Sequence, residues 1–67
     1  MTEPIDPKYP RVIARGNFQK ETENQLSVRM GETLYIIWRG YEQWLFVMNA
    51  NREQGFVDRN WVMEMLL

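Results

Sequence analysis

The chain has 67 residues, a formal net charge of −1, and neither cysteine nor histidine. This length allows one domain, and the near balance of charge indicates no electrostatic footprint for nucleic acid. Without cysteine or histidine, the sequence excludes a disulfide framework, an ordinary zinc site and a histidine-activated nucleophile, so we expect no metal, no cofactor and no catalysis.

Residues 1–10 contain all of the prolines, which are Pro4, Pro7 and Pro10. Proline restricts the residue before it to extended conformations, so this stretch is predicted to be a tail or linker. It has neither the basic nor the apolar region of a secretory leader, and the apolar runs of the chain are too short to span a membrane. We therefore expect one domain over residues 11–67, located in the cytoplasm and not inserted in a membrane.

From Arg11 onward, short apolar and β-branched runs alternate with polar or turn-forming stretches. The apolar runs predict extended segments at residues 12–14, 26–28, 34–38, 44–48, 55–57 and from 62 onward. The stretches between them predict loops or turns at residues 16–17, 19–25, 30–32, 39–42 and 49–52. So many short extended segments in so small a domain predict an all-β fold, which we expect to be a five-stranded barrel that leaves no exposed strand edges.

The end of the chain is less regular. Residues 58–60 can form a short helical turn before Trp61. Residues 61–67 are rich in methionine and leucine, which favour a helix intrinsically, but pairing within a sheet often overrides that preference. The pattern leaves both structures open for these last residues and predicts no longer helix elsewhere.

Alternation along the central strands predicts which side chains face the core. Leu34 and Ile36 share one face of their strand, and Leu45 and Val47 share one face of the next. Equivalent positions elsewhere complete the predicted core, and these are Val12, Ala14, Leu26, Val28, Val57 and Val62.

The opposite face of residues 44–48 carries Trp44, Phe46 and Met48. This face is predicted to be partly wet, which leaves two interpretations of Phe46 and Met48. Either a neighbouring loop or Tyr35 covers them, or they form a second contact surface that supports a weak homodimer. Scattered apolar side chains are normal on protein surfaces, which favours the first interpretation.

Two motifs are specific when taken together. Residues 26–34 follow the pattern Leu-Ser-apolar-x-x-Gly-acidic-x-apolar, and residues 55–62 read Gly-Phe-Val-Asp-Arg-Asn-Trp-Val. Eleven residues separate Glu32 from Trp44. In these features, over about residues 12–65, the chain resembles the Src homology 3 (SH3) domain.

The resemblance implies a five-stranded barrel with a short 3-10 turn before the last strand, and a surface groove for polyproline helices. Flat aromatic walls grip X-Pro pairs, and a ligand that is already extended loses little entropy on binding. Trp44 and Asn60 can also donate hydrogen bonds to ligand carbonyls. Carried over to this sequence, the peptide-binding residues are Phe18, Trp44, Phe56, Asn60 and Trp61.

Three positions depart from the family pattern. Gly16 stands where a groove tyrosine is expected, Gln25 where an acidic residue usually pairs a ligand cation, and Asp58 where a proline lines the groove floor. Glu21 and Glu23 remain in the loop and can restore the charge pairing. We therefore expect weak binding to ordinary basic PxxP peptides and an atypical preferred ligand.

These observations predict an interaction module, part of a larger signalling or cytoskeletal scaffold protein, that binds a proline-containing segment of another protein. The alternative is a structural or assembly domain that packs on its own parent chain or on a second copy. A mass measurement in solution separates the two.

Overall fold

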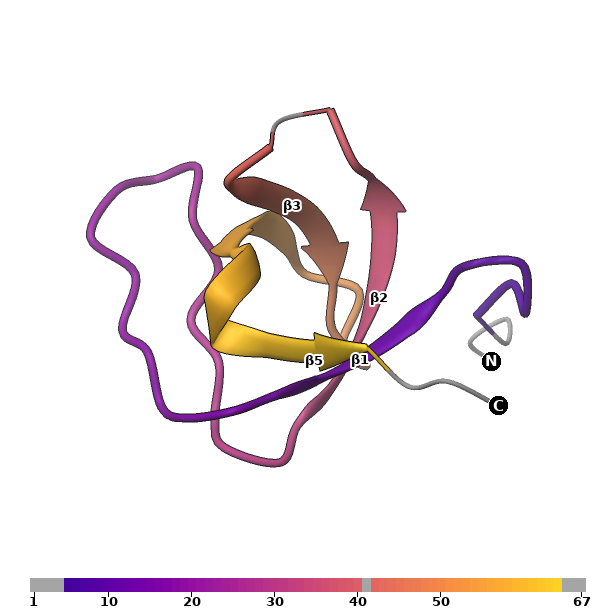
Figure 1. The fold of residues 1–67 in the computed structure, drawn as a ribbon, viewed down its shortest axis with the longest axis horizontal. Helices are drawn as coiled ribbons and strands as arrows, with labels where there is room; N and C mark the ends of the chain where they lie inside the picture. Colours follow the sequence, from indigo (N-terminus) through magenta and orange to yellow (C-terminus); the bar gives the residue numbers. More distant parts are fainter. Residues whose placement is uncertain (1–4, 41, 65–67) are drawn as a thin grey trace.

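Short strands and one helical turn make up the computed structural model, which describes residues 5–40 and 42–64. The expected all-β fold is confirmed (Figure 1). The elements are β1 (Arg11–Ala14), β2 (Thr33–Trp38), β3 (Trp44–Met48), β4 (Gln54–Asp58), the 3-10 turn η1 (Arg59–Trp61) and β5 (Val62–Glu64). The choice left open for the end of the chain is settled in favour of a strand over residues 62–64, and residues 65–67 lie outside the described residues.

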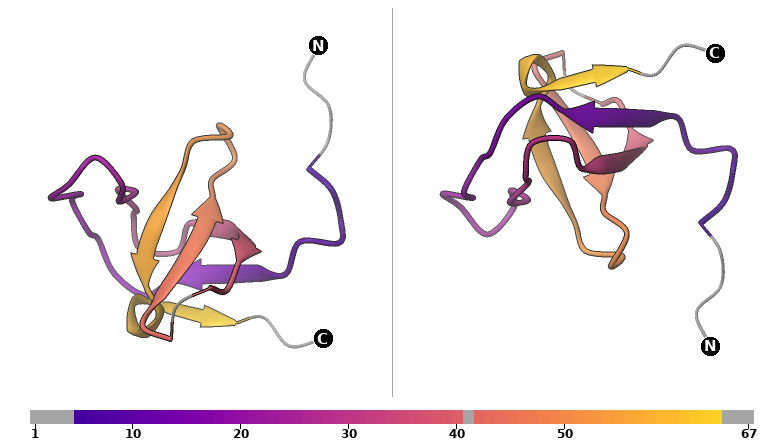
Figure 2. Two further views of the ribbon diagram at one scale, coloured as in Figure 1. Left: turned by 90° about the horizontal axis from the view of Figure 1, so that it is seen from above. Right: turned by 90° about the horizontal axis from the view of Figure 1, so that it is seen from below.

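The strands form one sheet in the order β4-β3-β2-β1-β5, in which every neighbouring pair is antiparallel. The sheet curls on itself, so that η1 carries the chain from β4 at one edge to β5 at the other (Figures 1 and 2). A long loop, residues 15–32, leaves the end of β1 and projects from one side of the barrel before returning to β2. This loop, β3, β4 and η1 position the candidate site.

Residues 26–28 were predicted to be extended, and the structure places them in this loop and not in the sheet. Isolated bridges take the place of a strand ladder here, joining Val28 to Phe18 and Gln25 to Phe56. Leu26 and Val28 are nevertheless both buried, because the segment keeps the alternation of an extended chain. The inward direction of Leu26 and Val28 was thus correctly predicted, although residues 26–28 do not form a strand of the sheet.

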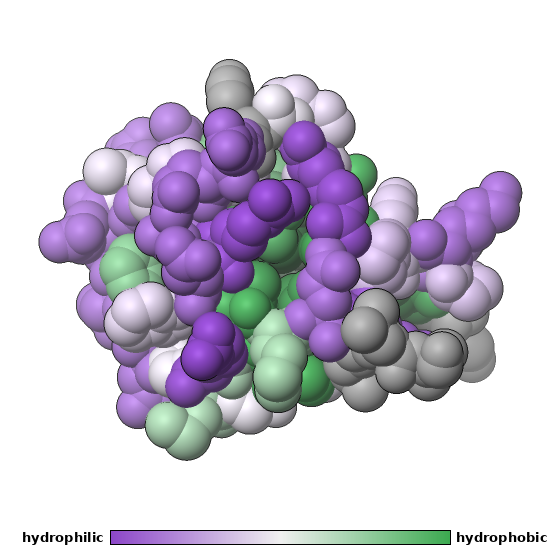
Figure 3. Space-filling view, in the orientation of Figure 1, coloured by the Kyte–Doolittle hydropathy of each residue, from purple (hydrophilic) through white to green (hydrophobic). Residues whose placement is uncertain are grey.

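The core consists of the side chains that alternation predicted to face inward, and all of them are buried. In the orientation of Figure 1, hydrophobic side chains show between hydrophilic ones near the middle of the barrel (Figure 3). The buried set is Val12, Ala14, Leu26, Val28, Leu34, Ile36, Leu45, Val47, Val57 and Val62. Since these residues come from every strand and from the loop, the core fixes the loop as well as the sheet.

Met48 corrects one prediction, because it was placed on a partly wet face and is in fact 5% exposed. It pairs with Tyr35 on β2 and with Gln54 on β4. The Gln54 side-chain nitrogen lies 3.8 Å from the Met48 sulfur. Phe46 is half-buried and packs edge-on against Phe56, with 5.0 Å between ring centroids. The interpretation in which neighbours cover these residues is therefore the correct one for Met48.

Candidate functional site

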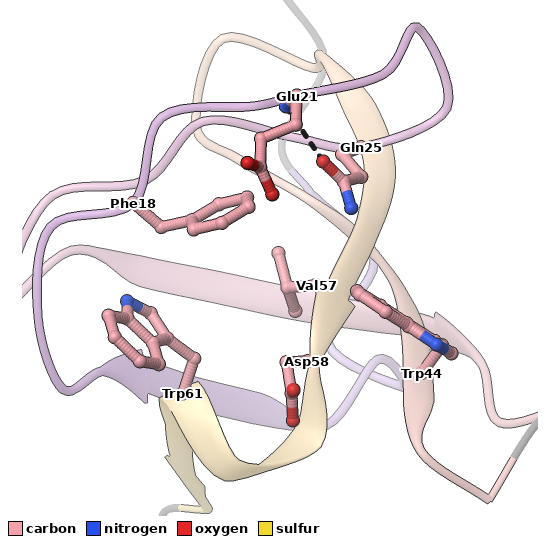
Figure 4. A pocket seen from close by; sticks show the side chains of 7 residues that line it. All are labelled: Phe18, Glu21, Gln25, Trp44, Val57, Asp58 and Trp61. Carbon is pink, nitrogen blue, oxygen red and sulfur yellow. Dashed lines mark hydrogen bonds between the residues drawn. The ribbon is translucent and has the colours of Figure 1, made fainter.

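A cavity of about 250 Å³ opens between the 15–32 loop on one side and β3, β4 and η1 on the other. This volume is below that of typical sites for whole small molecules, and it suits one or a few inserted side chains. We call it the aromatic cavity. Its lining residues are Phe18, Glu21, Gln25, Trp44, Val57, Asp58 and Trp61 (Figure 4).

Aromatic side chains lie on both sides of this cavity. Trp44 begins β3, and its neighbour Leu45 takes the inward direction, so the Trp44 indole lies on the outer face of the sheet. Phe18 and Trp61 lie on the opposite side in edge-to-face contact, with ring centroids 6.2 Å apart. Between the two sides lies Val57, whose side chain is almost fully buried and forms part of the floor. The result is a slot with flat apolar walls.

Trp61 is fixed by contacts with Gly16. Its indole N–H donates a hydrogen bond to the Gly16 carbonyl, with 3.2 Å between nitrogen and oxygen. A Cβ atom at Gly16 would lie 3.6 Å from the indole ring, which is ordinary van der Waals contact. The indole therefore covers the position at which a tyrosine side chain would emerge. Because its N–H is already bonded within the chain, Trp61 offers a ligand its ring face.

Gln25 organises the loop side of the cavity. Its side-chain oxygen accepts hydrogen bonds from the backbone N–H groups of Glu21, at 2.8 Å, and Thr22, at 3.3 Å. Its own backbone N–H donates to the Thr22 carbonyl at 3.2 Å. These bonds hold a tight turn that directs the Glu21 carboxylate toward the space above Val57 (Figure 4). An amide at this position thus supports the acidic side chain that faces the cavity.

Backbone contacts between the loop and β4 fix the distance across the cavity. The Leu26 N–H donates to the Phe56 carbonyl at 3.1 Å, and the Phe56 N–H donates to the Asn24 carbonyl at 2.7 Å. At Gly55 an added Cβ atom would lie 2.7 Å from the carbonyl carbon of Gln25. Real Cβ atoms do not approach backbone so closely, so this close approach of two chain segments requires glycine.

Asp58, which stands where the family has a proline, is hydrogen-bonded within the fold. Its carboxylate accepts hydrogen bonds from the Asn60 backbone N–H, at 2.8 Å, and from the Gln43 side chain, at 2.9 Å. It is the N-cap of η1, and its oxygens turn toward that helical turn and away from Val57 (Figure 4). Asp58 therefore borders the cavity while its charge is stabilised by the chain itself.

Three residues expected at the binding site lie elsewhere. Phe56 packs against Phe46 and does not line the cavity. Asn60 is exposed, and its backbone N–H donates a hydrogen bond to the Asp58 carboxylate. Glu23 is exposed, and its carbonyl accepts a long 3.5 Å hydrogen bond from Lys20. Their peptide-binding roles stay predictions.

Val57 was assigned only to the core, and the alternation that placed it there gave no signal that it also floors the cavity. The chemistry of the lining is that of a binding site, with rings, two carboxylates and an amide.

Among residues 5–40 and 42–64 there is no group of three or more histidine, cysteine, aspartate or glutamate side chains that could hold a metal ion. Over the same residues, no helix is long and apolar enough to cross a membrane.

The family model described as the SH3 domain matches residues 13–57. The chain belongs to the SH3 domain family. This SH3 domain is similar to the C-terminal SH3 domain of myosin IB from Entamoeba histolytica, solved bound to an EhFP10(GEF) peptide, with 26% identity and a TM-score of 0.83. That match covers 91% of this chain and 100% of the other.

Two further solved structures share the fold of this SH3 domain. The SH3 domain of yeast NBP2 is 24% identical, with a TM-score of 0.79 over 85% of this chain and 98% of that one. CED-2 is 29% identical with a TM-score of 0.82. The match covers 88% of this SH3 domain but 35% of CED-2, so in CED-2 the similar region is one part of a longer chain.

Proposed function

We propose that this SH3 domain binds an extended, proline-containing segment of another protein in its aromatic cavity. The observation that carries the proposal is the position of Trp44 across the cavity from Phe18 and Trp61. Opposed flat rings suit the rings of a polyproline helix, which is extended before it binds. The peptide bound to the similar domain of myosin IB supports the same use here.

The proposed specificity is atypical. The indole N–H of Trp61 is bonded to Gly16, and Gln25 places an amide where a carboxylate would pair a ligand cation. Of the two glutamates in the loop, Glu21 lines the cavity and Glu23 does not. A single exposed carboxylate contributes at most about 1 kcal/mol to an ion pair. Ordinary basic PxxP peptides should therefore bind weakly.

We further propose that the domain belongs to a larger cytoplasmic signalling or cytoskeletal scaffold and performs no catalysis. Two similar structures support a place in a larger protein. One is the C-terminal SH3 domain of myosin IB, and in CED-2 the similar region is 35% of the chain. The alternative of an assembly domain drew on the departures at Gly16, Gln25 and Asp58 and on the apolar side chains of Phe46 and Met48. Met48 is buried, which removes one part of that apolar surface.

The test is titration with an arginine-containing PxxP peptide and with a library of proline-containing peptides, followed by chemical-shift changes. We expect weak binding of the first, tighter binding of some library members, and shifts that cluster at the Trp44 indole and Glu21. Shifts located on another face, or no binding at all, would contradict the proposal. Low micromolar binding of the ordinary peptide would contradict the atypical specificity alone.

A double change sharpens the specificity test. Gly16→Tyr together with Asp58→Pro should restore about tenfold in affinity for the ordinary peptide, because together they add apolar contact worth about 1–2 kcal/mol. The double variant should also be less stable, because proline cannot cap η1. Loss of a cap lowers the free energy of unfolding by about 0.5–2 kcal/mol. Asp58→Ala is the control, since it removes the cap without adding a proline. Unchanged affinity in the folded double variant would show that these positions do not set the specificity.

A further inference from the structure

The segment before β1 has the spacing of a polyproline ligand. Its prolines are Pro4, Pro7 and Pro10, one at every third residue. A polyproline helix has three residues per turn, so in that conformation residues three apart lie on the same edge. The prolines would therefore form one continuous apolar edge. Pro7 and Pro10 are exposed in the structure, so both rings are accessible.

The same period sorts the charges of this segment. Lys8 and Arg11 are three apart and share the second edge, whereas Asp6 and Tyr9 share the third. A groove that contacts the proline edge and the basic edge leaves Asp6 pointing to solvent. The segment thus offers apolar rings and the Lys8 cation on adjacent edges, while Arg11 itself is the first residue of β1. This arrangement is the complement of a slot with aromatic walls and the Glu21 carboxylate.

We propose that the aromatic cavity of one copy of this chain binds residues 5–10 of a second copy, with Pro7 and Pro10 against Trp44 and with Lys8 near Glu21. This inference rests on the proposed function, since it uses the same cavity and the same ligand conformation. It adds the identity of one occupant, a segment of the chain itself. The matching features are the ring-lined slot and the Glu21 carboxylate directed into it.

The cavity of the same copy is out of reach. The Pro10 carbonyl accepts a hydrogen bond from the Ile36 N–H at 2.8 Å, which fixes Pro10 beside β2. Three residues span at most about 10 Å, so Pro7 stays within that distance of Pro10. All views place residues 5–10 at the end of the molecule opposite the 15–32 loop, and the long axis of the molecule is 31 Å (Figures 1 and 2). Contact must therefore be made between copies, head to tail.

A local turn competes with this docking. In the structure the Tyr9 N–H donates to the Asp6 carbonyl at 3.2 Å, and the Lys8 N–H donates to the Asp6 carboxylate at 2.9 Å. The turn must open before residues 6–9 adopt a polyproline helix. Because the carboxylate bond is exposed, water can replace it. Association is therefore weak, reversible and dependent on concentration, and Asp6→Ala should strengthen it by loosening the turn.

Complementation between two variants tests the inference. The tail variant carries Pro7→Ala with Pro10→Ala, and the cavity variant carries Trp44→Ala. Sedimentation equilibrium over a concentration series should show self-association of the unmodified chain and a loss of about tenfold or more in each variant alone. An equimolar mixture should regain association as one-to-one pairs, because one variant supplies the cavity and the other the segment. Unchanged self-association of the tail variant would overturn the inference.

A peptide arm separates this inference from the proposed function. A synthetic peptide of residues 3–12 is titrated into the tail variant, whose cavity is intact, beside the library peptides of the earlier test. If library peptides bind and this peptide does not, the inference fails and the proposed function stands. If neither binds, both fail. Binding of the 3–12 peptide should fall up to about fivefold with Lys8→Glu and not with Asp6→Asn, because only Lys8 faces the cavity.

Discussion

Two walls of the aromatic cavity are held in place by different means. The strand wall, Trp44 and Val57, belongs to the β3–β4 ladder, which is paired at five successive positions. The loop wall, Phe18, Glu21 and Gln25, stands on residues 15–32 and is held by isolated bridges and side-chain hydrogen bonds. The strand wall, with the Trp44 ring on a paired ladder, suits affinity for any proline segment. The loop wall carries the Glu21 charge, which discriminates among segments.

The largest effect is expected on the strand wall. Trp44→Ala should lower peptide affinity by about thirtyfold or more, because buried tryptophan contacts are worth about 2 kcal/mol or more at interfaces. Its half-buried indole lies outside the core, so the unfolding midpoint should hardly change. Calorimetric titration and thermal unfolding measure the two quantities. A variant that unfolds would show that Trp44 is part of the core.

Val47 lies on the opposite face of the same strand and is fully buried. Val47→Ala should leave a cavity and destabilise the fold by about 1–3 kcal/mol, with peptide affinity of the folded fraction retained. Denaturant unfolding measures the loss. A change of only a few tenths of a kcal/mol would mean that the inward and outward faces of β3 are wrongly assigned, and the contrast with Trp44 would disappear.

Gly55 lies where the loop packs most closely against β4, beside the backbone of Gln25. Gly55→Ala should destabilise by about 1–3 kcal/mol, since the added methyl meets the Gln25 backbone and one chain must move. Gly16→Ala is the matched control, because its methyl would rest at ordinary distance from the Trp61 ring. Equal stability of the two variants would contradict the close packing of loop on strand.

The smallest effect should belong to the loop wall. Glu21→Gln should weaken binding of a peptide with a basic residue by up to about fivefold, and Glu23→Gln should not, because only Glu21 lines the cavity. Raising the salt concentration should reduce the difference. Equal losses for both variants would show that the loop acts through its overall charge and not through one directed carboxylate.

Alternation alone predicted every member of the contiguous core cluster, because a buried face in a sheet leaves a period of two in the sequence. It failed for Met48, whose burial depends on Tyr35 and Gln54 across the strands and has no local pattern. The resemblance predicted that Phe18, Trp44 and Trp61 share one site, and the structure places all three in one cavity. It did not predict that Phe56 packs on Phe46.

Hydrogen-bond partners were the least predictable part of the site. Asp58 looked like a misplaced charge, and it is the cap of η1. Gln25 looked like a lost carboxylate, and it supports the turn that aims Glu21. In both cases a backbone N–H two to four residues away is a partner, and Asp58 also accepts a hydrogen bond from the distant Gln43 side chain. The sequence shows only that an acceptor is present.

The attachment of the loop to β4 has a consequence for the order of folding. Residues 24–26 bond to Phe56, which is far away along the chain, so these bonds form only after a large loop is closed. The β3–β4 pairing is local by comparison and can precede them. The binding site is therefore completed late, and amide hydrogens at Leu26 and Phe56 should exchange with solvent through local opening before those of β3.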